Sequence, residues 1–151
     1  MKKSARAVIS SYLIMILLAL MACEPTEERV VSEQWNEKQP KLVKYYLEKE
    51  EQKVKVREER FYKDGIRQYE GSFDETGDRH GEWRYYYTNG NLWSLGEYEH
   101  GLKHGKKEVY WPDGNKRYIG KFTNDEKSGN WIFFDTDGTV LQERNFSIKN
   151  E

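Results

Sequence analysis

The sequence predicts an all-β protein, an elongated single-layer antiparallel sheet built from tandem β-hairpin repeats. One short phrase recurs three times and places Gly81, Gly105 and Gly129 at a constant spacing of 24 residues. Each copy holds an Asn-Gly or Asp-Gly pair between runs rich in aromatic residues, a pattern typical of β-hairpins. The composition agrees, because 34% of the residues are charged and little aliphatic material is available for a thick core.

Residues 1–22 are predicted to be a targeting segment rather than part of the fold. Basic residues precede an apolar run that is shorter than the ~20 residues of a membrane-spanning helix. The run ends in Leu20-Met21-Ala22-Cys23, which resembles the lipobox of bacterial lipoproteins and places the only cysteine at the modified position. The resemblance implies cleavage before Cys23 and attachment of lipid, such as palmitate, to that residue. An ordinary secretory signal or a short membrane anchor is the alternative.

The charge balance excludes a nucleic-acid partner. Three of the 25 basic residues lie in the predicted leader, so 22 basic and 26 acidic residues remain after its removal. Nucleic-acid binding depends on clustered Lys and Arg that neutralise phosphates. With Cys23 committed to lipid, the chain has no cysteine left for a disulfide, and stability must come from hydrogen bonds and packing.

The segment that follows the leader is predicted to be a tether. Residues 23–40 would be the lipidated N-terminus and a flexible coil, because they are acidic, contain two prolines and show no sustained period. The repeat domain is predicted over 41–151. Its first part, 41–52, suits a helix face or a strand, and we favour a strand because the following residues alternate and are rich in β-branched and aromatic side chains.

Four hairpins are predicted from there onward, with repeats at about 57–80, 81–104, 105–128 and 129–151. The first copy is diverged. The pairs Asn89-Gly90, Asp113-Gly114 and Asp137-Gly138 are predicted to be two-residue type I′ turns, because such residues tolerate positive φ. The predicted strands are 53–62, 66–73, 82–88, 91–98, 106–111, 115–122, 130–135 and 139–146.

The predicted turns set the pairing of side chains. In the second hairpin Trp83 faces Gly96, so that the ring covers the glycine backbone. In the last hairpin Trp131 faces Arg144, whose guanidinium can stack on the indole. Alternation assigns Trp83, Tyr85 and Tyr87 to one face of the sheet and Tyr86 and Trp93 to the other. Recurring aromatic residues are expected to form two ladders, Phe61, Tyr86, Tyr110, Phe134 and Phe73, Tyr98, Phe122, Phe146.

The repeat resembles the MORN family, and more closely its bacterial variant, which is often described as an antitoxin-type repeat. The phrase Gly81-x-Trp83-x-x-Tyr86-x-x-Asn89-Gly90 carries the resemblance, and it recurs over about residues 57–147. The resemblance implies antiparallel hairpins and a protein-binding or scaffolding role, with an antitoxin- or immunity-like role as one form of it. It supplies no catalytic motif and no cofactor. The departures from the pattern are Lys107 for the first aromatic residue, Asp125 for the closing glycine and Arg144 for a mid-strand glycine.

Metal binding and catalysis are not predicted. His80 and His104 occupy the same position in successive repeats, which places them ~10 Å apart and too far to share an ion. Acidic residues crowd the turns, where turn chemistry already favours them. A glycosidase needs two carboxyl groups that face each other across a cleft, and a flat repeat sheet supplies none. We therefore expect a protein that is not an enzyme.

Exposed aromatic rings are the strongest functional signal. Large rings exceed what one thin sheet can bury, and aromatic patches rimmed by charge mark partner surfaces. The candidate partner-binding residues are Tyr85, Tyr87, Trp93, Trp111 and Trp83. The alternative is that the rings shield each other and the backbone. The sequence thus predicts a protein of the bacterial cell envelope, lipid-anchored to a membrane of undetermined leaflet, that binds an unknown protein. A glycan-binding or glycan-cleaving protein is the rival hypothesis.

Overall fold

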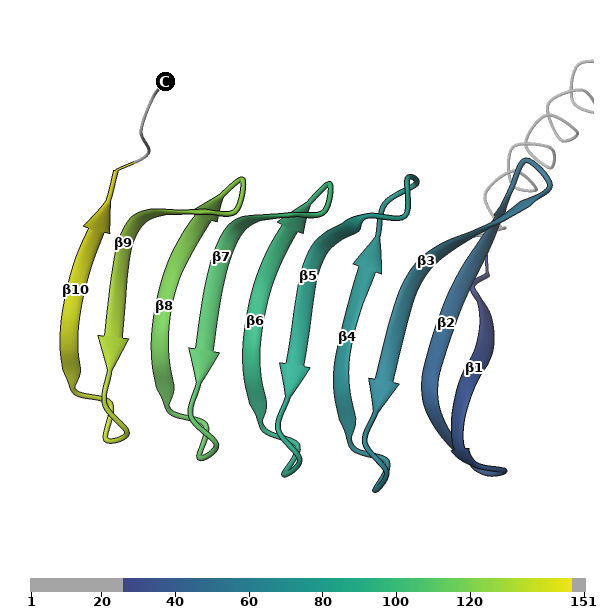
Figure 1. Ribbon diagram of the computed structural model, residues 1–151, viewed down its shortest axis with the longest axis horizontal. Helices are drawn as coiled ribbons and strands as arrows, with labels where there is room; N and C mark the ends of the chain where they lie inside the picture. The colour runs from purple at the N-terminus through teal and green to yellow at the C-terminus, as the bar shows by residue number, and fades with distance from the viewer. Residues whose placement is uncertain (1–25, 148–151) are drawn as a thin grey trace, which may run out of the picture.

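The computed structural model describes residues 26–147 of the 151-residue chain. Ten strands form one open antiparallel sheet in which every strand pairs with its neighbour in the sequence, so that β1 and β10 are the edges (Figure 1). The strands are β1 (Glu28–Asn36), β2 (Gln39–Lys49), β3 (Gln52–Phe61), β4 (Arg67–Phe73), β5 (Arg79–Tyr86), β6 (Leu92–Glu99), β7 (Leu102–Tyr110), β8 (Lys116–Thr123), β9 (Glu126–Phe134) and β10 (Val140–Phe146). The predicted single-layer hairpin ribbon is confirmed.

The predicted leader and Cys23 lie outside the described residues. Over residues 26–147, a helix of the length and apolar character needed to span a membrane is absent.

The first strand, β1, occupies residues predicted to be coil. It pairs with β2 through register partners such as Val31 and Val43. The Trp35 indole N–H also donates to the Phe61 carbonyl at 3.1 Å. Periodicity could not reveal β1, because the strand is held by backbone pairing with β2, and nearly all of its residues are exposed. The tether prediction is therefore wrong over 28–36 and 39–40, whereas the strand prediction for the segment 41–52 is confirmed over 41–49 by β2.

The loops that contain Asn89-Gly90, Asp113-Gly114 and Asp137-Gly138 hold three residues, not the predicted two. At one end of the second predicted hairpin, the Gly90 N–H donates to the Tyr87 carbonyl at 3.0 Å and the Tyr87 N–H donates to the Asn91 carbonyl at 2.9 Å. Gly90 has a φ of 86°, whereas Asn89 is not in the left-handed region. This is the hairpin loop that ends in a left-handed glycine and creates a bulge. Turns with two consecutive positive φ values occur instead at Glu50-Glu51, His100-Gly101 and Asn124-Asp125.

The bulge restores the predicted register beyond the loop and changes the face on which Trp93 lies. A register shift lies between Tyr85 and Tyr86, and beyond it Trp83 pairs with Gly96 as predicted. The extra residue brings Trp93 to the side of Tyr85 and Tyr87, at ring-centroid distances of 6.2 and 6.1 Å. The prediction that Trp93 faces the opposite side is therefore wrong, because strict alternation does not hold across a bulge.

The repeated glycines mark bends within strands. Gly81, Gly105 and Gly129 have φ values of 70°, 94° and 65°, and register shifts lie beside them. Figure 1 shows β5, β7 and β9 bending sharply near their first residues. These three strands begin earlier than predicted, because the bent residues remain paired with the preceding strand.

Two tryptophans form the centres of the aromatic core. Trp83 is 0% exposed and Trp131 is 1% exposed. We call the first cluster the first aromatic box; around Trp83 it contains Tyr69, Phe73, Tyr85 and Tyr98, at centroid distances of 5.3–6.4 Å. The second aromatic box surrounds Trp131 with Tyr118, Phe122, Phe133 and Phe146, at 5.1–6.3 Å. The predicted ladder of Phe73, Tyr98, Phe122 and Phe146 is therefore divided into two clusters.

Each central ring lies over a glycine of the preceding hairpin. A Cβ added at Gly71 would lie 2.6 Å from Cγ of Trp83 and closer still to two other ring atoms. Gly120 meets the ring of Trp131 in the same way, with a Cβ position 2.8 Å from Cε3. The prediction that Trp83 covers Gly96 is wrong, although the register is right. Each box thus joins two successive hairpins.

Cationic side chains cover the two boxes from outside. The Arg79 guanidinium lies 4.2 Å from the ring centroid of Trp83, within the range of a cation–π contact. Over Trp131 the cation is Lys127, at 4.4 Å, and not the predicted Arg144. Arg79 and Lys127 thus shield the indole rings from solvent, which explains how a single-layer sheet can bury them completely.

The middle repeat has no aromatic box. Lys107 stands where the preceding and the following repeat have Trp83 and Trp131, and it donates to the Ser94 hydroxyl. Burial, together with the nearby Lys103, lowers the pKa of the Lys107 amine. The departure of Lys107 from the repeat pattern therefore separates the two boxes by a polar gap.

Candidate partner-binding surface

Trp83 belongs to the core and not to a surface. Its ring is completely buried, and its indole N–H donates to the Ser72 carbonyl at 3.0 Å. The prediction that Trp83 contacts a partner is wrong, because the surrounding rings and Arg79 leave no accessible area.

Trp93 is the exposed member of the predicted set. Its side chain is 45% exposed, and the rings of Tyr85 and Tyr87 support it from the sheet side. Burial raises the pKa of the Tyr85 hydroxyl, which accepts a hydrogen bond from Arg79 at 3.1 Å. The Tyr87 hydroxyl donates to the Tyr110 carbonyl at 2.8 Å. We call Trp93, Tyr85 and Tyr87 the Trp93 surface, in which two anchored rings hold a third one out to solvent.

A groove borders the Trp93 surface. It has a volume of about 400 Å³ and lies over β3, β4, β5 and β6. Its lining residues are Arg60, Tyr62, Gln68, Tyr69, Tyr85, Tyr86 and Trp93. Most of these side chains are aromatic, and the charged one, Arg60, lies 3.7 Å from the Glu33 carboxylate. The lining of the groove is therefore mainly aromatic, with a few polar groups.

Trp111 is held differently from Trp93. The Arg117 guanidinium lies 4.5 Å from its ring centroid. Its indole N–H is buried without a hydrogen-bond partner among the described residues. At the equivalent positions of earlier repeats, Tyr62 and Tyr87 donate to carbonyl groups of the next hairpin at 2.9 and 2.8 Å. Trp111 thus occupies a position where Tyr62 and Tyr87 bond to the next hairpin. Among the described residues, no aromatic ring pair links Trp111 to the Trp93 surface.

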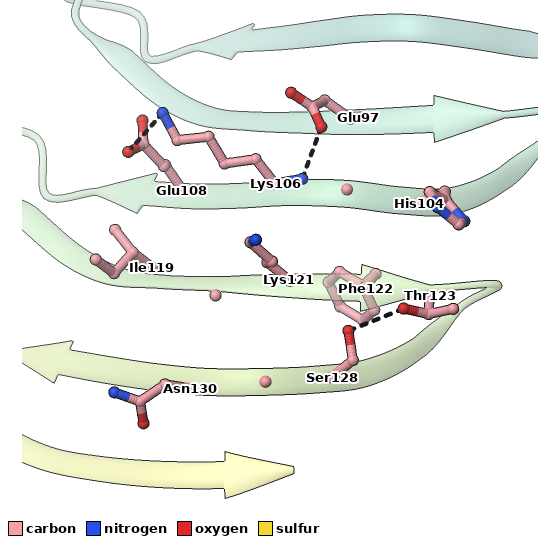
Figure 2. A pocket seen from close by; sticks show the side chains of 13 residues that line it. Glu97, His104, Lys106, Glu108, Ile119, Lys121, Phe122, Thr123, Ser128 and Asn130 are labelled. Atoms are coloured by element: carbon pink, nitrogen blue, oxygen red, sulfur yellow. Dashed lines mark hydrogen bonds and ion pairs between the residues drawn. The ribbon is translucent and has the colours of Figure 1, made fainter. Parts of the chain in front are cut away.

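A larger groove of about 800 Å³ crosses β6, β7, β8 and β9 (Figure 2). Its charged side chains are two of each sign, Glu97, Lys106, Glu108 and Lys121. The Glu97 carboxylate accepts from the backbone N–H of Lys106 at 2.8 Å, and the Lys106 ammonium lies 3.1 Å from Glu108. Although burial acts to raise it, the hydrogen bonds from Tyr110 and Lys106 lower the pKa of Glu108. The formal charges of the lining side chains therefore balance, and the groove has no excess charge to attract a charged ligand.

The histidines are arranged differently from the prediction. His80 lies beside His100, with ring centroids 5.6 Å apart, whereas His104 faces Asn124 at 3.2 Å. The His100 Nδ1 atom is 2.9 Å from an Asp74 carboxylate oxygen. Hydrogen bonds from Thr76 and His100 hold the pKa of Asp74 well below its usual range. This pair was not predicted, because His80 and His100 do not share a repeat position; the pairing of Gly81 with Tyr98 places them side by side.

Comparison with known families identifies the hairpins. Residues 79–100, 103–124 and 127–147 match the MORN repeat variant. Comparison with curated proteins returns no match. The three matched segments coincide with the hairpins β5–β6, β7–β8 and β9–β10, each of which opens with the bent strand described above. Residues 79–147 therefore contain three consecutive segments that match the MORN repeat variant.

Proposed function

We propose that this protein is a lipid-anchored component of the bacterial envelope that binds a protein partner through the Trp93 surface and performs no catalysis of its own. MORN repeats are generally protein- or membrane-binding modules. The observation that carries the proposal is the exposed ring of Trp93. The half-buried rings of Tyr85 and Tyr87 pack against it, and it lines an aromatic groove. A toxin is one class of partner, for which the protein would act as an antitoxin or immunity factor.

Physical arguments favour Trp93 as an anchor for a protein. Tryptophan is enriched among the few interface residues that contribute most of the binding energy. Its ring is already ordered by Tyr85 and Tyr87, so that binding loses little side-chain entropy. The equivalent positions in the next repeats hold Arg117 and Leu141. The Trp93 surface is therefore an individual feature of one repeat and not a general requirement of the fold.

Replacing Trp93 by alanine should weaken partner binding at least about 30-fold, the loss of an anchor worth about 2 kcal/mol. The full-length chain in mild detergent would capture the partner from envelope extracts, and the affinity would then be measured with the purified partner. Leu141→Ala is the matched control, because Leu141 occupies the same repeat position and is 64% exposed. Equal affinity of the Trp93→Ala and parent proteins would contradict the proposal. If the protein bound isolated cell-wall glycans and Trp93→Ala abolished that binding, the ligand would be a glycan and not a protein.

Replacing Cys23 by serine should abolish lipid labelling and transfer the protein from the membrane fraction to the soluble fraction. The reason is that thioether attachment of lipid requires the cysteine sulfur, and a serine side chain has none. Metabolic labelling with a palmitate analogue, followed by fractionation, measures both effects. Persistence of label and membrane association in Cys23→Ser would exclude the lipoprotein hypothesis.

A further inference from the structure

Three side chains that could ligate a metal converge at one loop edge of the sheet, beside the central strands β4 to β7. Asp74 comes from the β4–β5 loop, His80 from β5 and His100 from the β6–β7 turn. One ligand atom from each residue lies within 4.8 Å of those of the other two. The residues come from different segments, so the fold and not local sequence brings them together. This cluster lies apart from the Trp93 surface and plays no part in the proposed function.

The carboxylate of Asp74 is already oriented. Its Oδ1 atom accepts hydrogen bonds from the Thr76 N–H at 3.1 Å, the Thr76 hydroxyl at 2.7 Å and the Asp78 N–H at 2.9 Å. Its Oδ2 atom points to Nδ1 of His100, 2.9 Å away. One oxygen is thus held by the loop, and the other is directed toward the histidines. Hydrogen bonds of this kind orient the ligands of metal sites.

The backbone also fixes the two histidines relative to each other. His100 occupies a tight turn with a φ of 47°. The adjacent Gly101 N–H donates to the carbonyl of Arg79 at 2.9 Å, which ties the turn to the strand that carries His80. The imidazoles can rotate about their side-chain bonds, because both residues are exposed. Ligand atoms around a tetrahedral ion lie about 3.3 Å apart, since each bond is about 2.0 Å long. Side-chain rotation alone can close the remaining gap.

We propose that Asp74, His80 and His100 bind a divalent transition-metal ion. Two imidazoles and one carboxylate suit Zn²⁺, Co²⁺, Ni²⁺ or Cu²⁺, whereas Mg²⁺ and Ca²⁺ prefer oxygen ligands throughout. Three protein ligands leave at least one coordination position open to water or to an external donor. The site is open to solvent, so the ion can enter and leave without a change in the fold.

Metal titration of the full-length chain tests the site. The protein, purified in mild detergent and stripped with EDTA, would be titrated with Co²⁺ by visible absorption and with Zn²⁺ by calorimetry. The expected result is saturable binding of one ion per chain. His80→Ala and His100→Ala should each weaken the affinity at least about 10-fold, because even loss of an outer-shell partner has an effect of that size. Asp74→Asn, which keeps an oxygen acceptor for the loop, should weaken it as well.

His104→Ala is the matched control. His104 occupies the same repeat position as His80, but its ring faces Asn124 and not a second histidine. This variant should retain the parent affinity and the rise in unfolding temperature that the ion produces. Circular dichroism in EDTA would verify that each variant is folded. Equal affinity of all the variants, or no saturation at millimolar Zn²⁺, would overturn the proposal.

Discussion

Replacement of Trp83 by alanine is expected to lower the free energy of unfolding by about 3–5 kcal/mol, the cost of removing a large buried aromatic side chain. The Trp83 ring is 0% exposed and packs against the four other rings of the first aromatic box. Its removal would leave a cavity that the sheet cannot close, because Gly71 beneath it has no side chain to fill the space. The hydrogen bond to the Ser72 carbonyl would also be lost.

Urea unfolding followed by circular dichroism measures this loss, since fluorescence would itself change with the loss of tryptophan. Trp93→Ala is the internal control, because the exposed Trp93 ring should contribute at most about 0.5 kcal/mol. If Trp83→Ala unfolded at the urea concentration of the parent protein, the aromatic boxes would not be the core.

A methyl group at Gly71 should also destabilise the protein, by about 3 kcal/mol, the upper part of the range for overpacking. The added carbon would overlap ring atoms of Trp83. The ring has no space to move, because Phe73 and Tyr98 pack edge-on against it and Arg79 covers it. Gly71→Ala therefore tests the close contact between hairpins, independently of the indole itself.

Gly96→Ala is the matched control for this prediction. Gly96 holds the same repeat position, but the nearest atom to an added Cβ is Cδ of Lys107, at 3.4 Å. Because a lysine side chain can move aside, the change should alter the unfolding free energy by no more than about 0.5 kcal/mol. Urea midpoints of the two variants measure the difference. Similar losses in both would show that the glycines are required for strand conformation and not for ring packing.

The repeat made most of the sheet predictable. A period of 24 residues, with one turn signal in each copy, specifies the order of the hairpins and their approximate lengths. The register of Trp83 with Gly96 was also predictable, although the loop has one residue more than expected. The bulge beside Tyr86 compensates for that residue, so the ladder beyond it is unchanged.

Three features of the fold could not be predicted from the repeat pattern of the sequence. β1 is polar and aperiodic, and its backbone pairing with β2 leaves no trace in the order of side chains. The burial of Trp83 depends on Gly71 in the preceding hairpin, a contact between repeats that analysis of a single hairpin cannot reveal. The two-residue turn prediction failed because only the glycine of Asn89-Gly90 adopts positive φ.

The candidate site was predictable in part. Tyr85, Tyr87 and Trp93 were selected from the sequence, and the structure brings their rings together. Their common side of the sheet was not predictable, because it depends on the bulge. His80 and His100 differ by 20 residues and do not share a repeat position, so only the register of the hairpin places them side by side.

Site-specific photo-crosslinking tests directly whether the Trp93 surface contacts a protein partner. A photoreactive aromatic amino acid would replace Trp93 in the full-length chain inside cells, and Leu141 in a parallel variant. We predict one discrete protein adduct from position 93 and none from position 141. The absence of an adduct at 93, or the same adducts from both positions, would contradict the assignment of partner binding to the Trp93 surface.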